Sequence, residues 1–177
     1  MSRIIQYDYN GHHIRHWGGS DNPDENYQIK SAHGVAIDYR EKGNPMVVVT
    51  SRNNACFKWF TLDGKYIKTL NLPNMQVCRP VFDDSNLYAG VCWSQPKVGK
   101  TSWKEPTGFV TILEGDKVVS NPGATAPLYL NGELQKTYQL PDRPISHGHD
   151  VCVDNDKNLY ICQWRADKTP PLKLERV

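Results

Sequence analysis

The sequence has no long apolar run and no marked excess of charge of either sign. No segment approaches the ~20 consecutive apolar residues of a membrane-spanning helix, and residues 1–20 contain two arginines and three histidines where a signal peptide would be apolar. The 21 basic and 19 acidic residues give a net charge of +2 and are spread along the chain, so long-range attraction to nucleic acid or to an anionic membrane has little support. We therefore expect a soluble protein with no nucleic-acid or membrane partner and no export signal in this chain.

Closely spaced cysteine pairs are also missing. The chain has five cysteines, an odd number that leaves one unpaired in any all-disulfide scheme, and none of them form a C-x-x-C pair. This usage argues against a disulfide framework. We expect reduced and mostly buried thiols.

The chain has few stretches with helical periodicity, but it does contain a repeated hairpin. Three segments align position by position, with Gly11 on Gly64 and Lys117 on Lys65. In each copy a β-branched or aromatic run leads to an Asn-Gly or Asp-Gly type of turn and a second short run, which predicts two antiparallel strands.

A second pattern recurs between these hairpins. Residues 33–38 align with residues 78–83 and 149–154, and each of these segments is followed by a hydrophobic strand, at residues 46–50, 87–92 and 159–164. Each unit therefore contains four short strands and repeats after roughly 50 residues, which is typical of the blades of a β-propeller. The predicted fold class is all-β.

One part of the chain resembles a known repeat family. Residues 33–69 resemble an NHL repeat, and residues 108–113, His149-Asp150 and residues 173–176 are similar to the C-terminal half of six-bladed NHL-type proteins related to peptidyl-α-hydroxyglycine α-amidating lyase. The resemblance implies a six-bladed NHL-type β-propeller. Relatives of this fold are often secreted or periplasmic, whereas this chain shows no signal, so the compartment stays open.

The blade count predicts about three blades within a single domain of residues 1–177. Residues 33–70 form one blade, and residues 78–140 form a second that is enlarged by insertions near 94–107 and 120–139. The third blade is split, because residues 147–177 supply its inner strands and residues 3–17 supply two outer strands. Since closed propellers need roughly four to eight blades, we expect a homodimer closed to six blades by strand exchange. The alternatives are a truncated piece of a longer propeller and a half that pairs with a different chain.

Candidate metal ligands begin the blades. His33, Cys78 and His149 precede the innermost strand of each unit, where equivalent positions converge on the central channel, and imidazole and thiolate are preferred ligands of zinc. In the amidating lyase, histidines from alternate blades hold a zinc ion, and His33 and His149 have a similar placement. His147 lies two residues from His149 and faces the same way on an extended chain, so it is a further candidate for zinc or another divalent metal. Structural roles for all four residues are the alternative.

Candidate ligand-binding residues lie in the channel and at strand ends. Arg52 and Arg79 are candidate channel cations, Trp93 and Trp164 follow the second strand of a blade, and Trp103 lies in the first insertion. Loops at strand ends commonly bind ligands. The favoured function is a binding module that recognises a protein, peptide or glycan on one face of the disc. The alternative is a metal-dependent lyase or hydrolase with a histidine-lined channel, in which the ion acts as a Lewis acid or activates water.

Overall fold

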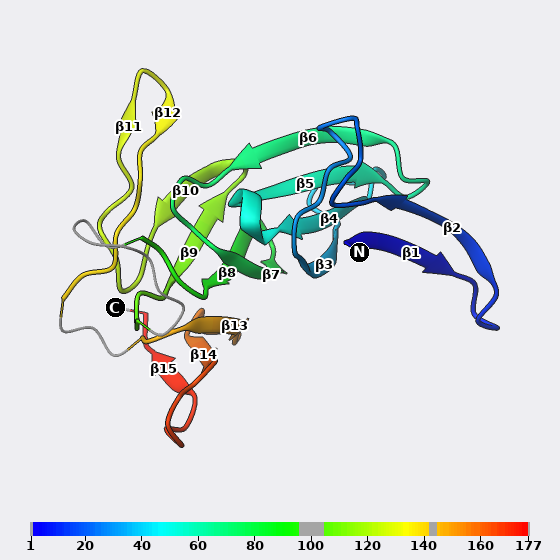
Figure 1. Ribbon diagram of the computed structural model, residues 1–177. Helices are drawn as coiled ribbons and strands as arrows, with labels where there is room; N and C mark the ends of the chain where they lie inside the picture. Colours follow the sequence, from blue (N-terminus) through cyan, green and yellow to red (C-terminus); the bar gives the residue numbers. More distant parts are fainter. Residues whose placement is uncertain (1, 96–104, 142–144, 177) are drawn as a thin grey trace.

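The computed structural model describes residues 2–95, 105–141 and 145–176 and is built from antiparallel β-sheets (Figure 1). These residues contain no α-helix, and their one short 3₁₀ turn is η1, Arg52–Asn54. The all-β prediction is confirmed. None of the described segments is a helix long and apolar enough to cross a membrane.

The first sheet is a four-stranded meander with the order β3-β4-β5-β6. Its strands are β3 (Ala32–Asp38), β4 (Met46–Ser51), β5 (Cys56–Thr61) and β6 (Tyr66–Asn71). Strands β4 and β5 are almost entirely buried, which explains their nearly continuous apolar sequences, because both faces of the sheet are covered. The turn between β5 and β6 places Gly64 at φ +87°, a left-handed conformation that glycine adopts without steric cost.

The second sheet has the order β10-β9-β8-β7 and repeats the same meander. Its strands are β7 (Val77–Asp83), β8 (Asn86–Val91), β9 (Phe109–Glu114) and β10 (Lys117–Ser120). The predicted second insertion, residues 120–139, contains a small separate hairpin of β11 (Tyr129–Leu130) and β12 (Glu133–Leu134).

The third sheet contains one strand more than the sequence predicts. Its strands are β13 (Gly148–Val153), β14 (Leu159–Gln163) and β15 (Leu172–Leu174). Only β13 and β14 are expected from the repeat, whereas Leu172 and Leu174 pair with Ile161 and Leu159 of β14 to add β15. The second edge of β14 is therefore covered within the chain, and β15 is the outer edge strand of this sheet.

The N-terminal hairpin is a separate two-stranded sheet of β1 (Arg3–Tyr7) and β2 (His13–Gly18). Ile4 and Trp17 of this hairpin pack against a buried cluster that includes Val49 and Phe60 of the first sheet. The hairpin thus covers one face of the first sheet.

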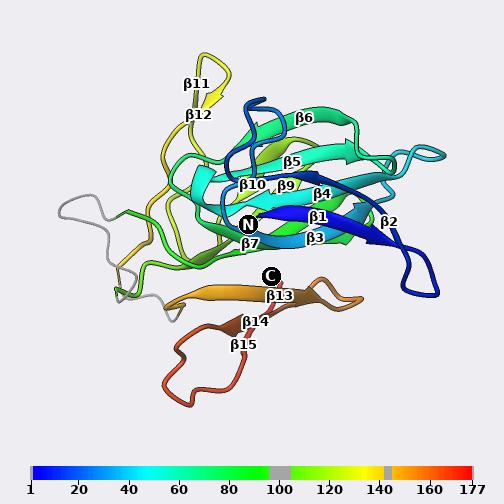
Figure 2. The same cartoon turned by 45° about the vertical axis from the view of Figure 1, so that its right-hand side comes forward.

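The three larger sheets stack face to face. Alternate residues of β5 point to opposite faces, so that Phe57 and Trp59 join the core shared with the second sheet, while Phe60 faces the hairpin. A further cluster, which includes Val110 and Ile161, joins the second sheet to the third. The first strands β3, β7 and β13 lie along one side of this stack, with β7 in contact with both others (Figures 1 and 2).

Close approach of these first strands depends on glycine. A Cβ atom added at Gly34 of β3 would lie 2.4 Å from the Cα atom of Arg79 on β7. Backbone cannot yield as a flexible side chain can, so Gly34→Ala should destabilise the fold by about 1–3 kcal/mol. Urea unfolding measures this loss, and Lys42→Ala, on an exposed turn, should unfold like the unmodified protein. Equal midpoints for all three proteins would show that the two strands separate without cost.

Candidate metal centre

Three side chains from three different sheets meet at one end of the stack. His33, Cys78 and His149 are each the second residue of a first strand, on β3, β7 and β13. Each offers one ligand atom, and these atoms all lie within 4.8 Å of one another. The rings of His33 and His149 are 4.8 Å apart between centroids and nearly perpendicular, at 77°. The structure therefore brings together the three equivalent positions of the sequence repeat.

A break in strand pairing occurs at each of these three positions. The register of the first two strands of every sheet shifts at or beside the candidate ligand, namely between Ala32 and Val35, between Val77 and Pro80, and between Gly148 and Asp150. Irregularities of this kind turn a side chain away from its regular direction. The same register shift thus occurs in all three copies of the repeat, and each copy presents one donor atom.

The cluster contains an unsatisfied polar atom. Cys78 is fully buried, His33 and His149 are half-buried, and the buried Nδ1 atom of His33 has no hydrogen-bond partner among the described residues. A buried nitrogen without a partner costs about 1–3 kcal/mol. An imidazole nitrogen left in this state beside a thiol and a second imidazole fits a metal ion, because a metal would use its lone pair.

Cys92 is a neighbour of Cys78 in this cluster, although it is not among the candidate ligands taken from the sequence. The hydrogen bond from its thiol, together with the neighbouring His33 and His149, lowers the pKa of Cys78 to about 5 in spite of burial. The same hydrogen bond, burial and the charge of Cys78 raise the pKa of Cys92. The lowered pKa favours the thiolate form of Cys78, and the thiolate is the form that binds zinc.

His147 does not join the cluster. Its Nδ1–H donates to the backbone carbonyl of Cys92 at 2.9 Å, its side chain is buried, and its ring centroid lies 5.7 Å from that of Trp164. These contacts hold the ring between two strand ends. His147 is thus oriented by the Cys92 carbonyl and the Trp164 ring, outside the group formed by His33, Cys78 and His149.

Three of the predicted ligand-binding residues form a row at the same end of the sheets. Arg52, Trp93 and Trp164 follow the second strands β4, β8 and β14. The guanidinium carbon of Arg52 lies 4.8 Å from the centroid of the Trp93 ring, and the Trp93 and Trp164 centroids are 6.2 Å apart. We call this set the Arg52–Trp93–Trp164 row.

The other two predicted ligand-binding residues are not in this row. Arg79 on β7 forms an ion pair of 3.1 Å with Asp150 on β13, so its charge is already matched within the protein. Trp103 lies outside the described residues.

Comparison with known proteins adds no functional assignment. No protein-family model matches the chain, and no curated protein matches it significantly. The geometry of the cluster and of the row beside it is therefore the basis for assigning a function.

Proposed function

We propose that His33, Cys78 and His149 bind a zinc ion, and that the protein acts as a metal-dependent lyase or hydrolase. The observation that carries this proposal is the convergence of three donor atoms within 4.8 Å, together with the unpartnered buried nitrogen of His33. Each donor comes from a different sheet, so the three donors meet only when the three larger sheets are packed together. Two imidazoles and a thiolate form a donor set that zinc prefers over magnesium or calcium.

The proposed centre requires only a small contraction. Zinc binds nitrogen at about 2.0–2.1 Å and sulfur at about 2.3 Å, which places tetrahedral donors roughly 3.3–3.6 Å apart. Side-chain rotations that shorten the 4.8 Å limit by roughly 1.2–1.5 Å would give this geometry. Three protein ligands leave a fourth position for water or substrate, as in catalytic zinc sites.

The ligands have distinct tasks in this proposal. The imidazoles of His33 and His149 and the thiolate of Cys78 hold the ion, which supplies Lewis acidity or activates a bound water. The Cys92 thiol donates a hydrogen bond to Cys78. This bond disperses charge on the thiolate and orients it.

The proposed architecture is an NHL-type β-propeller in which the three larger sheets are blades. The repeated meander, the face-to-face stacking and the contacts of β7 with both β3 and β13 support it. Since propellers close with four to eight blades, the chain would supply about half of a six-bladed ring. The metal centre would then lie at one end of the central channel.

A second candidate function is a binding module for a peptide or another ligand that carries a carboxylate. The Arg52–Trp93–Trp164 row favours it, because the buried Nε atom of Arg52 has no hydrogen-bond partner among the described residues and a guanidinium matches a carboxylate in shape and charge. The indole rings would cover an apolar group of the same ligand.

Arg52 should give the row a preference for free carboxylates. An N-acetylated dipeptide acid should bind at least about tenfold more tightly than its amide, since a hydrogen bond to a charged group contributes about 1.5–3 kcal/mol. Arg52→Gln should remove the preference, and Arg3→Gln on the exposed part of β1 should keep it. Tryptophan fluorescence measures both affinities. Equal affinities for acid and amide in the unmodified protein would contradict this function.

Substitution with Co²⁺ tests the metal site and its sulfur ligand together. The purified protein should bind one Co²⁺ per chain and show a thiolate-to-cobalt absorption band in the near ultraviolet. Cys78→Ser should abolish this band, whereas Cys162→Ser, which changes an exposed cysteine, should leave it intact. Failure to bind Co²⁺ or Zn²⁺ at micromolar concentration, in a protein with the expected β-sheet circular dichroism, would overturn the proposal.

A further inference from the structure

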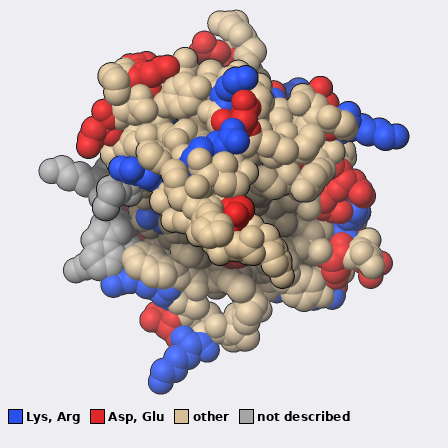
Figure 3. Space-filling model, turned by 90° about the vertical axis from the view of Figure 1, so that its right-hand side faces the viewer, with Lys and Arg blue, Asp and Glu red and all other residues tan. Residues whose placement is uncertain are grey.

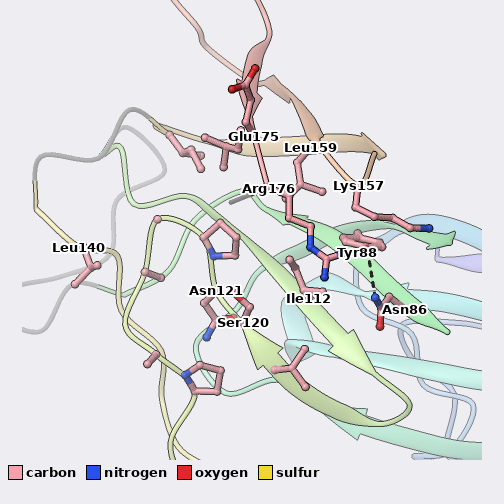
Figure 4. A pocket seen from close by; sticks show the side chains of 18 residues that line it. Asn86, Tyr88, Ile112, Ser120, Asn121, Leu140, Lys157, Leu159, Glu175 and Arg176 are labelled. Atoms are coloured by element: carbon pink, nitrogen blue, oxygen red, sulfur yellow. Dashed lines mark hydrogen bonds between the residues drawn. The ribbon is translucent and has the colours of Figure 1, made fainter. Parts of the chain in front are cut away.

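A groove runs beside the outer strands of the third sheet, whereas the metal cluster lies on the first strands β3, β7 and β13. It has a volume of about 940 Å³ and lies between β14–β15 and the outer strands of the second sheet (Figure 4). Its lining combines the apolar side chains Ile112, Val119, Leu159 and Leu174, on β9, β10, β14 and β15, with the charged side chains of Lys157, Glu175 and Arg176. The outer strand β15 thus adjoins a hollow with an apolar strip and a charged rim.

In the first sheet, a fourth strand occupies the position that corresponds to this groove. Its fourth strand, β6, lies over the second sheet, where Leu70 packs against the shared core and Lys68 pairs with Asp116 at 2.6 Å. The third sheet has three strands and no equivalent of β6 among the described residues. The groove is the position that outer strands of the third sheet would fill.

Within the described part of the chain, the third sheet lacks a fourth strand, whereas the N-terminal hairpin is a pair of strands that belongs to no larger sheet. One face of β1–β2 packs on the first sheet, while Ile5, Tyr7 and Ile14 are 45%, 55% and 45% exposed. Figure 3 looks onto this end of the molecule, whose centre is mostly uncharged, with Lys, Arg, Asp and Glu chiefly around it. The repeat aligns this hairpin with β5 and β6, the outer strands of the first sheet.

We infer that the groove binds the β1–β2 hairpin of a second copy of this chain, which rests on the proposed propeller architecture but not on the metal. The hairpin would lie along β15 of its partner and turn its Ile5, Tyr7 and Ile14 face onto β9 and β10 of that partner. Its other face would stay on its own first sheet. The exposed apolar face of the hairpin and the apolar strip of the groove would then cover each other.

A two-fold axis makes this contact twice. Each copy offers one hairpin and one groove, so two copies satisfy both pairs and form a closed dimer with no free docking site. Covering the edge of β15 also removes an exposed edge that would otherwise promote aggregation. Because β15 already occupies the third position of its sheet, the hairpin adds strands beyond it rather than replacing two missing ones.

Light scattering coupled to size-exclusion chromatography tests the inference. The protein should elute with about twice the 20.2 kDa mass of one chain, and Ile5→Glu should weaken the dimer at least 100-fold, because it would bury a carboxylate against the apolar residues of β9 and β10. Leu62→Glu introduces the same charge at a site that is 47% exposed and should leave the dimer intact. The groove side is checked by pairing Ile5→Cys with Val119→Cys, which should form a disulfide between chains under mild oxidation.

The outcomes separate this inference from the proposed metal centre. Since His33, Cys78 and His149 come from one chain, the Ile5→Glu monomer should still bind one zinc ion. A monomeric unmodified protein at 100 μM would overturn the inference, as would a dimer that survives Ile5→Glu or a double-cysteine variant that forms no disulfide between chains. Binding of the groove by a different chain, with the protein alone monomeric, would also overturn it.

Discussion

His149→Ala is expected to lower zinc affinity by more than about 100-fold. Loss of partners that only orient a ligand already costs 10–100-fold, and this change removes one of three direct donors. The imidazole of His149 lies 4.8 Å from that of His33 between centroids, and His147 is not a member of the three-residue group. Competition with a chromophoric chelator measures the affinity.

His12→Ala is the matched control for this substitution. His12 is exposed and pairs with Asp8 on the N-terminal hairpin, so its loss should leave zinc affinity unchanged. Circular dichroism establishes that both variants fold. If His149→Ala bound zinc as tightly as His12→Ala, the cluster would be no metal site.

Asp38→Ala is expected to reduce the free energy of unfolding by about 3–5 kcal/mol, the usual cost of removing one member of a buried ion pair. Asp38 is 1% exposed and accepts hydrogen bonds from Arg40 at 2.7 Å and from the Trp59 indole at 3.0 Å. Arg40 also donates to the carbonyl oxygens of Ser85 and Gly115, which lie in the β7–β8 and β9–β10 turns of the second sheet. The substitution therefore leaves Arg40 without its carboxylate and weakens the joint between two sheets.

Urea unfolding measures this loss, with Asp63→Ala as the control on an exposed turn. Asp63→Ala should change the unfolding free energy by less than about 1 kcal/mol, as is usual for exposed ion pairs. Similar losses for the two variants would show that the Asp38–Arg40 pair does not join the sheets.

The contribution of Asp38 should also depend on pH. Burial opposes its ionisation, but hydrogen bonds from Arg40 and Trp59 outweigh burial and hold its pKa below 3.8. A lowered pKa in the folded state means that the stabilisation is complete above the unfolded pKa and is lost as pH falls through the folded pKa. The stability difference between the unmodified protein and Asp38→Asn should be constant from pH 7 to about pH 5 and shrink below pH 4. A difference that grew on acidification would contradict this assignment.

The periodicity of the sequence was enough to predict the strands of the two four-stranded sheets and the equivalence of His33, Cys78 and His149. Hydrophobic runs and Gly-containing turns are local signals, and alignment of the copies identifies positions that share a place in each sheet. The meeting of the three side chains depends on this equivalence and on the stacking of the sheets.

Other features depend on contacts that the sequence does not reveal. β15 is only three residues long and follows two prolines, so its pairing with β14 is a tertiary effect. The role of His147 depends on a carbonyl 55 residues away. Cys92 could have been found by noting that it ends the strand segment next to Cys78, but its thiol contact follows from the shifted register of β7.

X-ray absorption at the zinc edge tests the central claim most directly. Zinc-loaded protein with one ion per chain should show a first shell that contains nitrogen at about 2.0–2.1 Å, one sulfur at about 2.3 Å and the outer-ring scattering of two imidazoles. Cys78→Ser should remove the sulfur contribution and keep the imidazoles. A shell of nitrogen and oxygen alone in the unmodified protein, or less than one bound zinc per chain, would contradict a centre built from His33, Cys78 and His149.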